Sequence, residues 1–111
     1  MKHLGLSLAL LLAGAIGAHA RIYEGSEAAA LRCADMLLIA VVELENRGEL
    51  PEVQRDVMLL IAASILDRHV SGTRQQKEAA LWALRERRTP EQTLLDFERL
   101  SVRCLEQFPI N

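Results

Sequence analysis

Two capping boxes fix where helices begin in the C-terminal half of the chain. Thr73 is followed three residues later by Gln76, and Thr89 is followed by Gln92, with Pro90 directly after Thr89. In a capping box, the threonine and glutamine side chains each satisfy a backbone group left free at the helix start, and proline suits the first helical position. We therefore expect helices over about 74–87 and 90–107.

A third helix is predicted in the N-terminal half of the chain, beginning near Ser26. Ser26 is a suitable N-cap, and Gly48 suits the left-handed backbone that follows many helices, so this helix should end at about Asn46. Its centre, residues 36–42, is apolar on every side, which a solvent-facing helix would not tolerate. Other helices or a second molecule should therefore cover this apolar girdle, with Ile39 as the residue to watch.

A fourth helix is predicted between the first one and the capping boxes. Pro51 is well placed for its first turn, and Ser71-Gly72 should end it. Apolar residues recur at helical spacing along it, which predicts one side that packs on the core. The members of this expected core stripe are Val53, Val57, Leu60, Ile61 and Ile65.

Composition supports an all-α fold. Half of the 111 residues are hydrophobic but only 4% are aromatic, and leucine and alanine favour helices over strands. Short connections between four helices favour an antiparallel up-down-up-down arrangement. We predict a small antiparallel four-helix bundle.

Residues 1–20 have the features of a secretory signal. An apolar run from Leu4 to Ala18 follows a short basic start, and Ala18-His19-Ala20 is a small-x-small cleavage pattern. The run is shorter than the roughly 20 residues that cross a bilayer, which favours a cleaved signal over a permanent membrane anchor. We expect a periplasmic protein, with residues 21–111 as a single helical domain.

The two cysteines, Cys33 and Cys104, are predicted to form a disulfide. Export to an oxidising compartment favours bonding, and the C-x-x-C spacing typical of a redox-active pair is absent. In an antiparallel bundle, the start of the first helix and the end of the fourth lie at the same level. A bridge that closes a loop of about 70 residues should stabilise the fold by roughly 4 kcal/mol.

Charge and motifs argue against several classes of function. The formal net charge of -2 provides no electrostatic attraction to nucleic acid. Beyond residue 20 the only histidine is His69, and no metal-ligand or haem-attachment spacing occurs, so we expect no metal and no cofactor. The serines lack a paired base, so we also expect no enzymatic activity.

One short string resembles a family motif. Thr89-Pro90-Glu91-Gln92 is similar to the L-T-x-x-Q signature of the Spy-like periplasmic chaperones, but Arg88 stands where that family has leucine. A capping box accounts for the same residues. In architecture, an exported helical domain with one long-range disulfide also looks like the small acid-stress chaperones and the periplasmic immunity proteins of type VI secretion amidase toxins. These likenesses assign no family.

Trp82 is the candidate contact residue for a protein partner. The helix over 74–87 should bury Ala80, Leu81 and Leu84, which leaves Trp82 at the edge of the core. A tryptophan beside arginine is typical of a binding hot spot, while the alternative is a boundary side chain that simply packs. The candidate partner-binding residues are Trp82, Arg85 and Arg88.

Two charged ends are also expected to orient a partner. The basic end comprises Arg74, Lys77, Arg85, Arg87 and Arg88, and the acidic end comprises Glu43, Glu45, Glu49, Glu52 and Asp56. These features favour a non-enzymatic protein that binds a periplasmic protein, as an immunity protein or inhibitor does. The alternative is a periplasmic stress or acid holdase chaperone, and the apolar girdle further predicts a homodimer.

Overall fold

The computed structural model describes residues 21–111, and the predicted signal over residues 1–20 lies outside the described residues. The described chain is all-helical. Its four helices are α2 (Gly25–Asn46), α3 (Glu52–His69), α4 (Arg74–Arg87) and α5 (Pro90–Gln107). The prediction of a small all-α bundle with one disulfide is confirmed.

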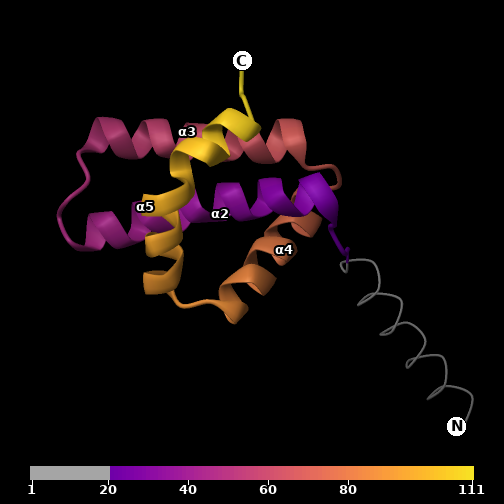
Figure 1. Ribbon diagram of the computed structural model, residues 1–111, viewed down its shortest axis with the longest axis horizontal. Helices are drawn as coiled ribbons and strands as arrows, with labels where there is room; N and C mark the ends of the chain where they lie inside the picture. Colours follow the sequence, from indigo (N-terminus) through magenta and orange to yellow (C-terminus); the bar gives the residue numbers. More distant parts are fainter. Residues whose placement is uncertain (1–20) are drawn as a thin grey trace, which may run out of the picture.

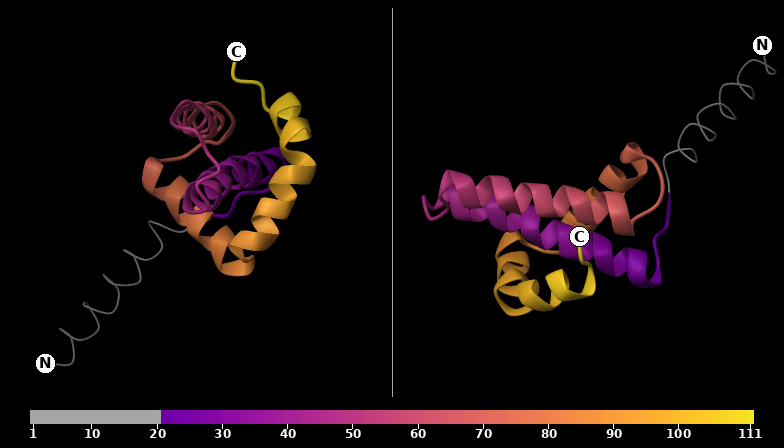
Figure 2. Two further views of the ribbon diagram at one scale, coloured as in Figure 1. Left: turned by 90° about the vertical axis from the view of Figure 1, so that its left-hand side faces the viewer. Right: turned by 90° about the horizontal axis from the view of Figure 1, so that it is seen from above.

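Helix α2 is the centre of the bundle, and each of the other three helices packs against it. Helices α2 and α3 form an antiparallel hairpin, whereas α5 crosses α2 at a steep angle and α4 runs obliquely to it (Figure 1). Seen from above, the far end of the α2–α3 hairpin projects beyond α5 (Figure 2). The described helices include none that is both long enough and apolar enough to cross a membrane.

The predicted capping boxes both form. The Thr73 hydroxyl accepts from the Gln76 N–H at 3.2 Å, and the Gln76 side chain accepts from the Thr73 N–H at 2.9 Å. Thr89 and Gln92 repeat this exchange at 3.1 and 2.9 Å. Each box satisfies backbone groups that the first turn leaves free, so α4 and α5 begin where the sequence predicts.

The start of α2 differs from the prediction. The helix begins at Gly25, and the residue at the N-cap is Glu24, whose side chain makes no capping hydrogen bond, so Ser26 is not the cap. The other end agrees, because Gly48 has a φ of +67° and its N–H bonds back to the Glu45 carbonyl at 2.9 Å. This left-handed glycine directs the chain back toward α3.

Polar side chains from the start of the described chain hold the turn between α3 and α4. The Glu27 carboxylate accepts from both the backbone N–H and the hydroxyl of Ser71, at 2.6 and 2.7 Å. Tyr23 donates to the Ser71 carbonyl and Arg21 donates to its hydroxyl, both at 2.7 Å. Gly72 allows this close approach, since a Cβ there would lie 2.7 Å from the Tyr23 hydroxyl. The turn is therefore fixed to α2.

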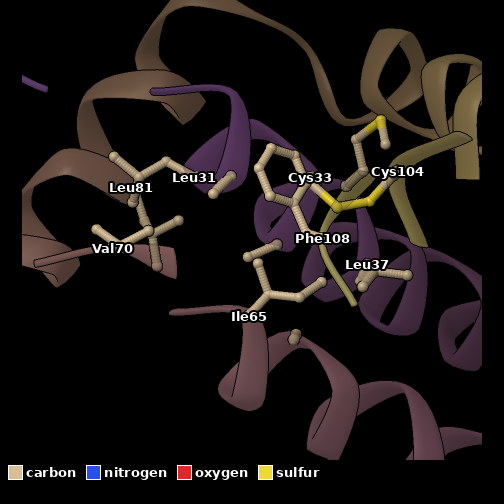
Figure 3. Close-up of a cluster of buried hydrophobic side chains, with 12 residues drawn as sticks. Leu31, Cys33, Leu37, Ile65, Val70, Leu81, Cys104 and Phe108 are labelled. Carbon is tan, nitrogen blue, oxygen red and sulfur yellow. A yellow bond between two sulfur atoms is a disulfide. The ribbon is translucent and has the colours of Figure 1, made fainter. Parts of the chain in front are cut away.

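The core lies around the first half of α2. Side chains from all four helices and from the segments after α3 and α5 meet there (Figure 3). The Cys33–Cys104 disulfide lies within this cluster, with its Cα atoms 5.5 Å apart, and so ties α2 to the last turn of α5. The buried members labelled in Figure 3 are Leu31, Cys33, Leu37, Ile65, Val70, Leu81, Cys104 and Phe108.

The predicted core stripe of α3 is wrong at three of its positions. Val53, Val57 and Leu60 are exposed by 75%, 49% and 65%, while Ile65 is buried and Ile61 is partly buried. Apolar spacing identifies a helix but cannot tell which of two apolar sides faces the core. Here the side that packs on α2 comprises Met58, Ile61, Ala62, Ile65 and Leu66.

The apolar girdle of α2 is largely covered by the same chain. Met36, Leu37, Ala40 and Val41 are buried and Ile39 is partly buried, so within the girdle only Val42 is exposed. The three helices around α2 achieve this coverage. Because the chain itself covers the girdle, the girdle gives no reason to expect a homodimer.

Candidate functional site

Trp82 projects from the middle of α4 and is 64% exposed. The Arg85 guanidinium lies over its ring, with the guanidinium carbon 5.2 Å from the ring centroid. This distance is within the range of a cation–π contact, which limits the orientations that the indole adopts. The pair presents a large apolar surface beside a positive charge.

A buried carboxylate holds Arg85 in this position. The Arg85 Nε donates to Asp35 Oδ1 at 2.9 Å, and Asp35 is buried on α2. Burial raises the pKa of Asp35, and the hydrogen bond and charge of Arg85 act in the opposite direction. The ion pair fixes α4 against α2 and orients the guanidinium against the face of the Trp82 ring. A lone acidic residue just before the apolar girdle was the sequence signal for this anchor, but the sequence alone did not identify its partner.

Arg88, the third predicted site residue, is also held by an acidic side chain. It lies at the end of α4, where its guanidinium bonds to the Asp96 carboxylate of α5 at 2.6 Å. The pair therefore bridges the two ends of the α4–α5 connection. Arg88 remains partly exposed, so it can still contact a partner through its free edge.

A cavity of about 290 Å³ adjoins these residues between α2, α4 and α5. Arg88, one of the predicted site residues, lines this cavity. Asp35, the carboxylate that holds Arg85, lines it too. The disulfide forms part of its wall. The volume is at the lower limit of the roughly 300–1,000 Å³ typical of small-molecule sites, so the cavity suits a single side chain of a partner.

The cavity is positively charged at its rim. Its two acidic residues, Asp35 and Asp96, are both ion-paired, to Arg85 and Arg88. Two other arginines line the cavity, and neither forms an ion pair within residues 21–111. These are Arg32 on α2 and Arg103 on α5.

The predicted basic end of the molecule is partly neutralised by ion pairs. Arg74 pairs with Glu78 at 3.0 Å, and the Lys77 ammonium donates to the Leu66 carbonyl at 2.8 Å. Arg85 and Arg88 are paired as described above, which leaves Arg87 without an ion pair among the described residues. Three of the five basic residues are therefore ion-paired, and Lys77 and Arg87 keep their positive charge at this end.

The predicted acidic end lies at the far end of the α2–α3 hairpin. Arg55 neutralises part of it, with its guanidinium 3.3 Å from Glu45, 3.6 Å from Glu52 and 3.0 Å from Asp56. Glu43 and Glu49 make no ion pair within the described chain. This end therefore retains negative charge, well separated along the hairpin from the Trp82 surface.

His69 has a structural contact at the end of α3. Its Nε2 donates to the Pro109 carbonyl at 2.8 Å, and its ring meets Phe108 edge-on, with the centroids 5.4 Å apart. These contacts fasten the C-terminal segment to α3. In residues 21–111, histidine, cysteine, aspartate and glutamate side chains form no group of three that could hold a metal ion.

Comparison with protein-family models, with curated proteins and with solved structures finds no match to this chain. A functional hypothesis must therefore come from the site itself. Of the three predicted site residues, Trp82 is the most exposed. Arg85 follows it on α4 and Arg88 caps the end of that helix, and each binds a carboxylate of another helix.

Proposed function

We propose that this chain is an exported, non-enzymatic protein that binds a periplasmic protein partner through α4, in the manner of an immunity protein or inhibitor. The observation that carries the proposal is an exposed Trp82 stacked on an arginine that a buried carboxylate holds in place. Such pre-ordered aromatic and arginine side chains lose little conformational freedom when they bind.

Two features support a periplasmic location. The first is the signal-like sequence of residues 1–20. The second is the Cys33–Cys104 disulfide, because such bonds persist in oxidising compartments.

The test is a comparison of two exposed apolar positions. The oxidised domain, residues 21–111, is used to capture a partner from a periplasmic extract, and the affinity for the purified partner is then measured. Trp82→Ala should weaken binding by at least about 2 kcal/mol, roughly thirtyfold. Leu95→Ala is the control, since Leu95 is 58% exposed but lies on α5 rather than on α4.

Thermal melting of both variants separates binding from folding. Trp82→Ala should keep most of the stability, since a largely exposed side chain contributes little to the fold. A Trp82→Ala protein that melts far earlier yet binds normally when folded would return Trp82 to a packing role. Equal losses of affinity for both variants would likewise exclude α4 as the specific contact surface.

A holdase chaperone is the second candidate function, because large apolar side chains are exposed on more than one helix. Examples are Leu60 on α3 and Val102 on α5, exposed by 65% and 69%. A chaperone should bind an apolar dye more strongly as the pH falls from about 7 to about 2, and should suppress aggregation of an unfolded client. An inhibitor-like protein should show one stoichiometric partner and no such activity.

A further inference from the structure

Helix α3 has two apolar sides, and the chain covers only one of them. The covered side packs on α2 through residues such as Ile65, which is fully buried. The opposite side presents Val53, Val57 and Leu60, which we call the outer stripe of α3. A helix that is apolar on opposite sides is normally enclosed on both.

The spacing of the outer stripe suits a helix of a second molecule. Intervals of four and three residues, from Val53 to Val57 to Leu60, place these side chains in one row along the helix. Ser64 continues the row at the next interval of four, and Ala63 lies beside it. Small residues at this end allow a facing helix to approach closely.

Charged residues lie at both ends of the stripe. Glu49 lies just before α3, and Asp67 and Arg68 lie in its last turn. All three are exposed, and none has an ion-pair partner within residues 21–111. A second copy placed antiparallel brings each glutamate near the arginine of the other copy. The same register sets Val57 against Leu60 and Val53 against Ser64.

We propose that a second copy of this chain covers the outer stripe, with the two α3 helices antiparallel about a twofold axis. The surface is self-complementary, as a twofold interface requires, because apolar residues meet at the centre and Glu49 of each copy lies near Arg68 of the other. This homodimer differs from the one expected from the α2 girdle. It goes beyond the proposed function, since the Trp82 surface on α4 remains available.

The first test is the molar mass of the oxidised domain by light scattering between about 1 and 100 µM, the range in which weak dimers populate. The wild-type domain should approach the mass of two chains at the upper limit. Leu60→Glu should weaken association at least about a hundredfold, because each new carboxylate would be buried against Val57 of the other copy, close to the twofold axis. Val102→Glu on α5, a position of similar exposure, should leave the mass unchanged.

The second test is a charge exchange that specifies the orientation. Arg68→Glu should weaken the dimer about threefold to tenfold, as expected for losing two exposed ion pairs. Adding Glu49→Arg in the same chain should restore wild-type association, because each copy again presents opposite charges. Circular dichroism and thermal melting confirm that every variant is folded.

Each contrary outcome overturns a defined part of the proposal. A wild-type mass of one chain at about 100 µM excludes the dimer. A dimer that Leu60→Glu leaves intact, or that Val102→Glu dissociates, uses a different surface. Failure of the charge exchange to restore association excludes the antiparallel register.

Discussion

The two ends of the α2–α3 hairpin are similar in sequence character but differ in packing. At one end, α4 and α5 cross α2, a disulfide joins α2 to α5, and Leu37 and Ile65 are buried. At the other end the hairpin projects alone (Figure 1), and Val53 is exposed. Local hydrophobicity therefore does not determine burial in this molecule. Contact with α2 does, because the buried side of α3 is the side that packs on α2.

Charge follows the same division. At the packed end, ion pairs join helices to one another, as Asp35–Arg85 joins α2 to α4 and Asp96–Arg88 joins α5 to the end of α4. At the projecting end, Arg55 pairs with acidic residues of the hairpin alone. Electrostatic contacts thus fix the bundle at one end and leave the other end dependent on two helices.

The largest expected effect is loss of the disulfide at the packed end. Cys104→Ser should lower the free energy of unfolding by roughly 4 kcal/mol, because the bridge closes a loop of about 70 residues. Chemical denaturation of the variant and of the wild type measures the difference. In unreduced wild-type protein, mass spectrometry should find neither cysteine alkylated, even after denaturation. A loss below about 1 kcal/mol would contradict a bridge that holds the two helices together.

Alanine substitutions on the two sides of α3 sharpen the comparison within one helix. Ile65→Ala should cost about 2–5 kcal/mol, since it leaves a cavity in the core. Leu60→Ala should cost less than about 1 kcal/mol in dilute protein, where the outer stripe faces water. Denaturation at low micromolar concentration checks both values. Similar losses at the two positions would mean that α3 packs on both sides in a single copy.

The buried ion pair predicts a smaller effect that depends on pH. Arg85→Ala should cost about 1–3 kcal/mol at neutral pH, because it leaves the Asp35 carboxylate buried without its partner. Burial raises the pKa of Asp35, so this carboxyl binds a proton more readily in the folded state, and lowering the pH relieves the cost. The difference between Arg85→Ala and wild type should therefore shrink as the pH falls.

Asp35→Asn provides the control for this pair. Asparagine has no charge to bury. Adding Arg85→Ala to Asp35→Asn should therefore lower the free energy of unfolding by an amount that depends little on pH over the same range. A pH-dependent difference that persists without the Asp35 carboxyl would assign the effect to another group.

We expect the smallest change in stability at Glu27, whose pKa is shifted in the direction opposite to that of Asp35. Hydrogen bonds from Ser71 lower the pKa of this carboxyl, and Arg21 and Lys77 assist. Its contribution to stability is complete above the ordinary glutamate pKa of about 4.3 and is lost as the pH falls through the lowered value. Thermal melts of Glu27→Gln and wild type should therefore differ at neutral pH and converge in acid. A constant difference would show that the Ser71 contacts do not depend on the charge.

Local signals predicted the helices well, because capping depends on residues close together in sequence. The capping boxes at Thr73 and Thr89 and the glycine at 48 placed three helix ends. The disulfide was also predicted correctly from the export-like start and the cysteine count. These features require little knowledge of how the helices pack.

The errors arose where tertiary packing decides the outcome. Val53 and Val57 have the same spacing as core residues, but they lie on the side of α3 that does not pack on α2. Similarly, nothing in the sequence pairs Asp35 with Arg85, since the two residues meet only because α4 lies obliquely on α2. Trp82 was placed at the edge of the core by periodicity, whereas its contact with a partner stays a prediction.

The most direct test of the contrast within α3 is the solvent access of its side chains in a single folded copy. A soluble paramagnetic agent is added to the methyl-labelled Arg68→Glu domain at low micromolar concentration, where the weakened association should leave single copies. Methyl relaxation is then compared in one spectrum. The methyl groups of Leu60 should relax strongly, and those of Ile65 should be nearly unaffected. Equal protection of Leu60 and Ile65 would show that the chain covers both sides of α3 and would contradict the account.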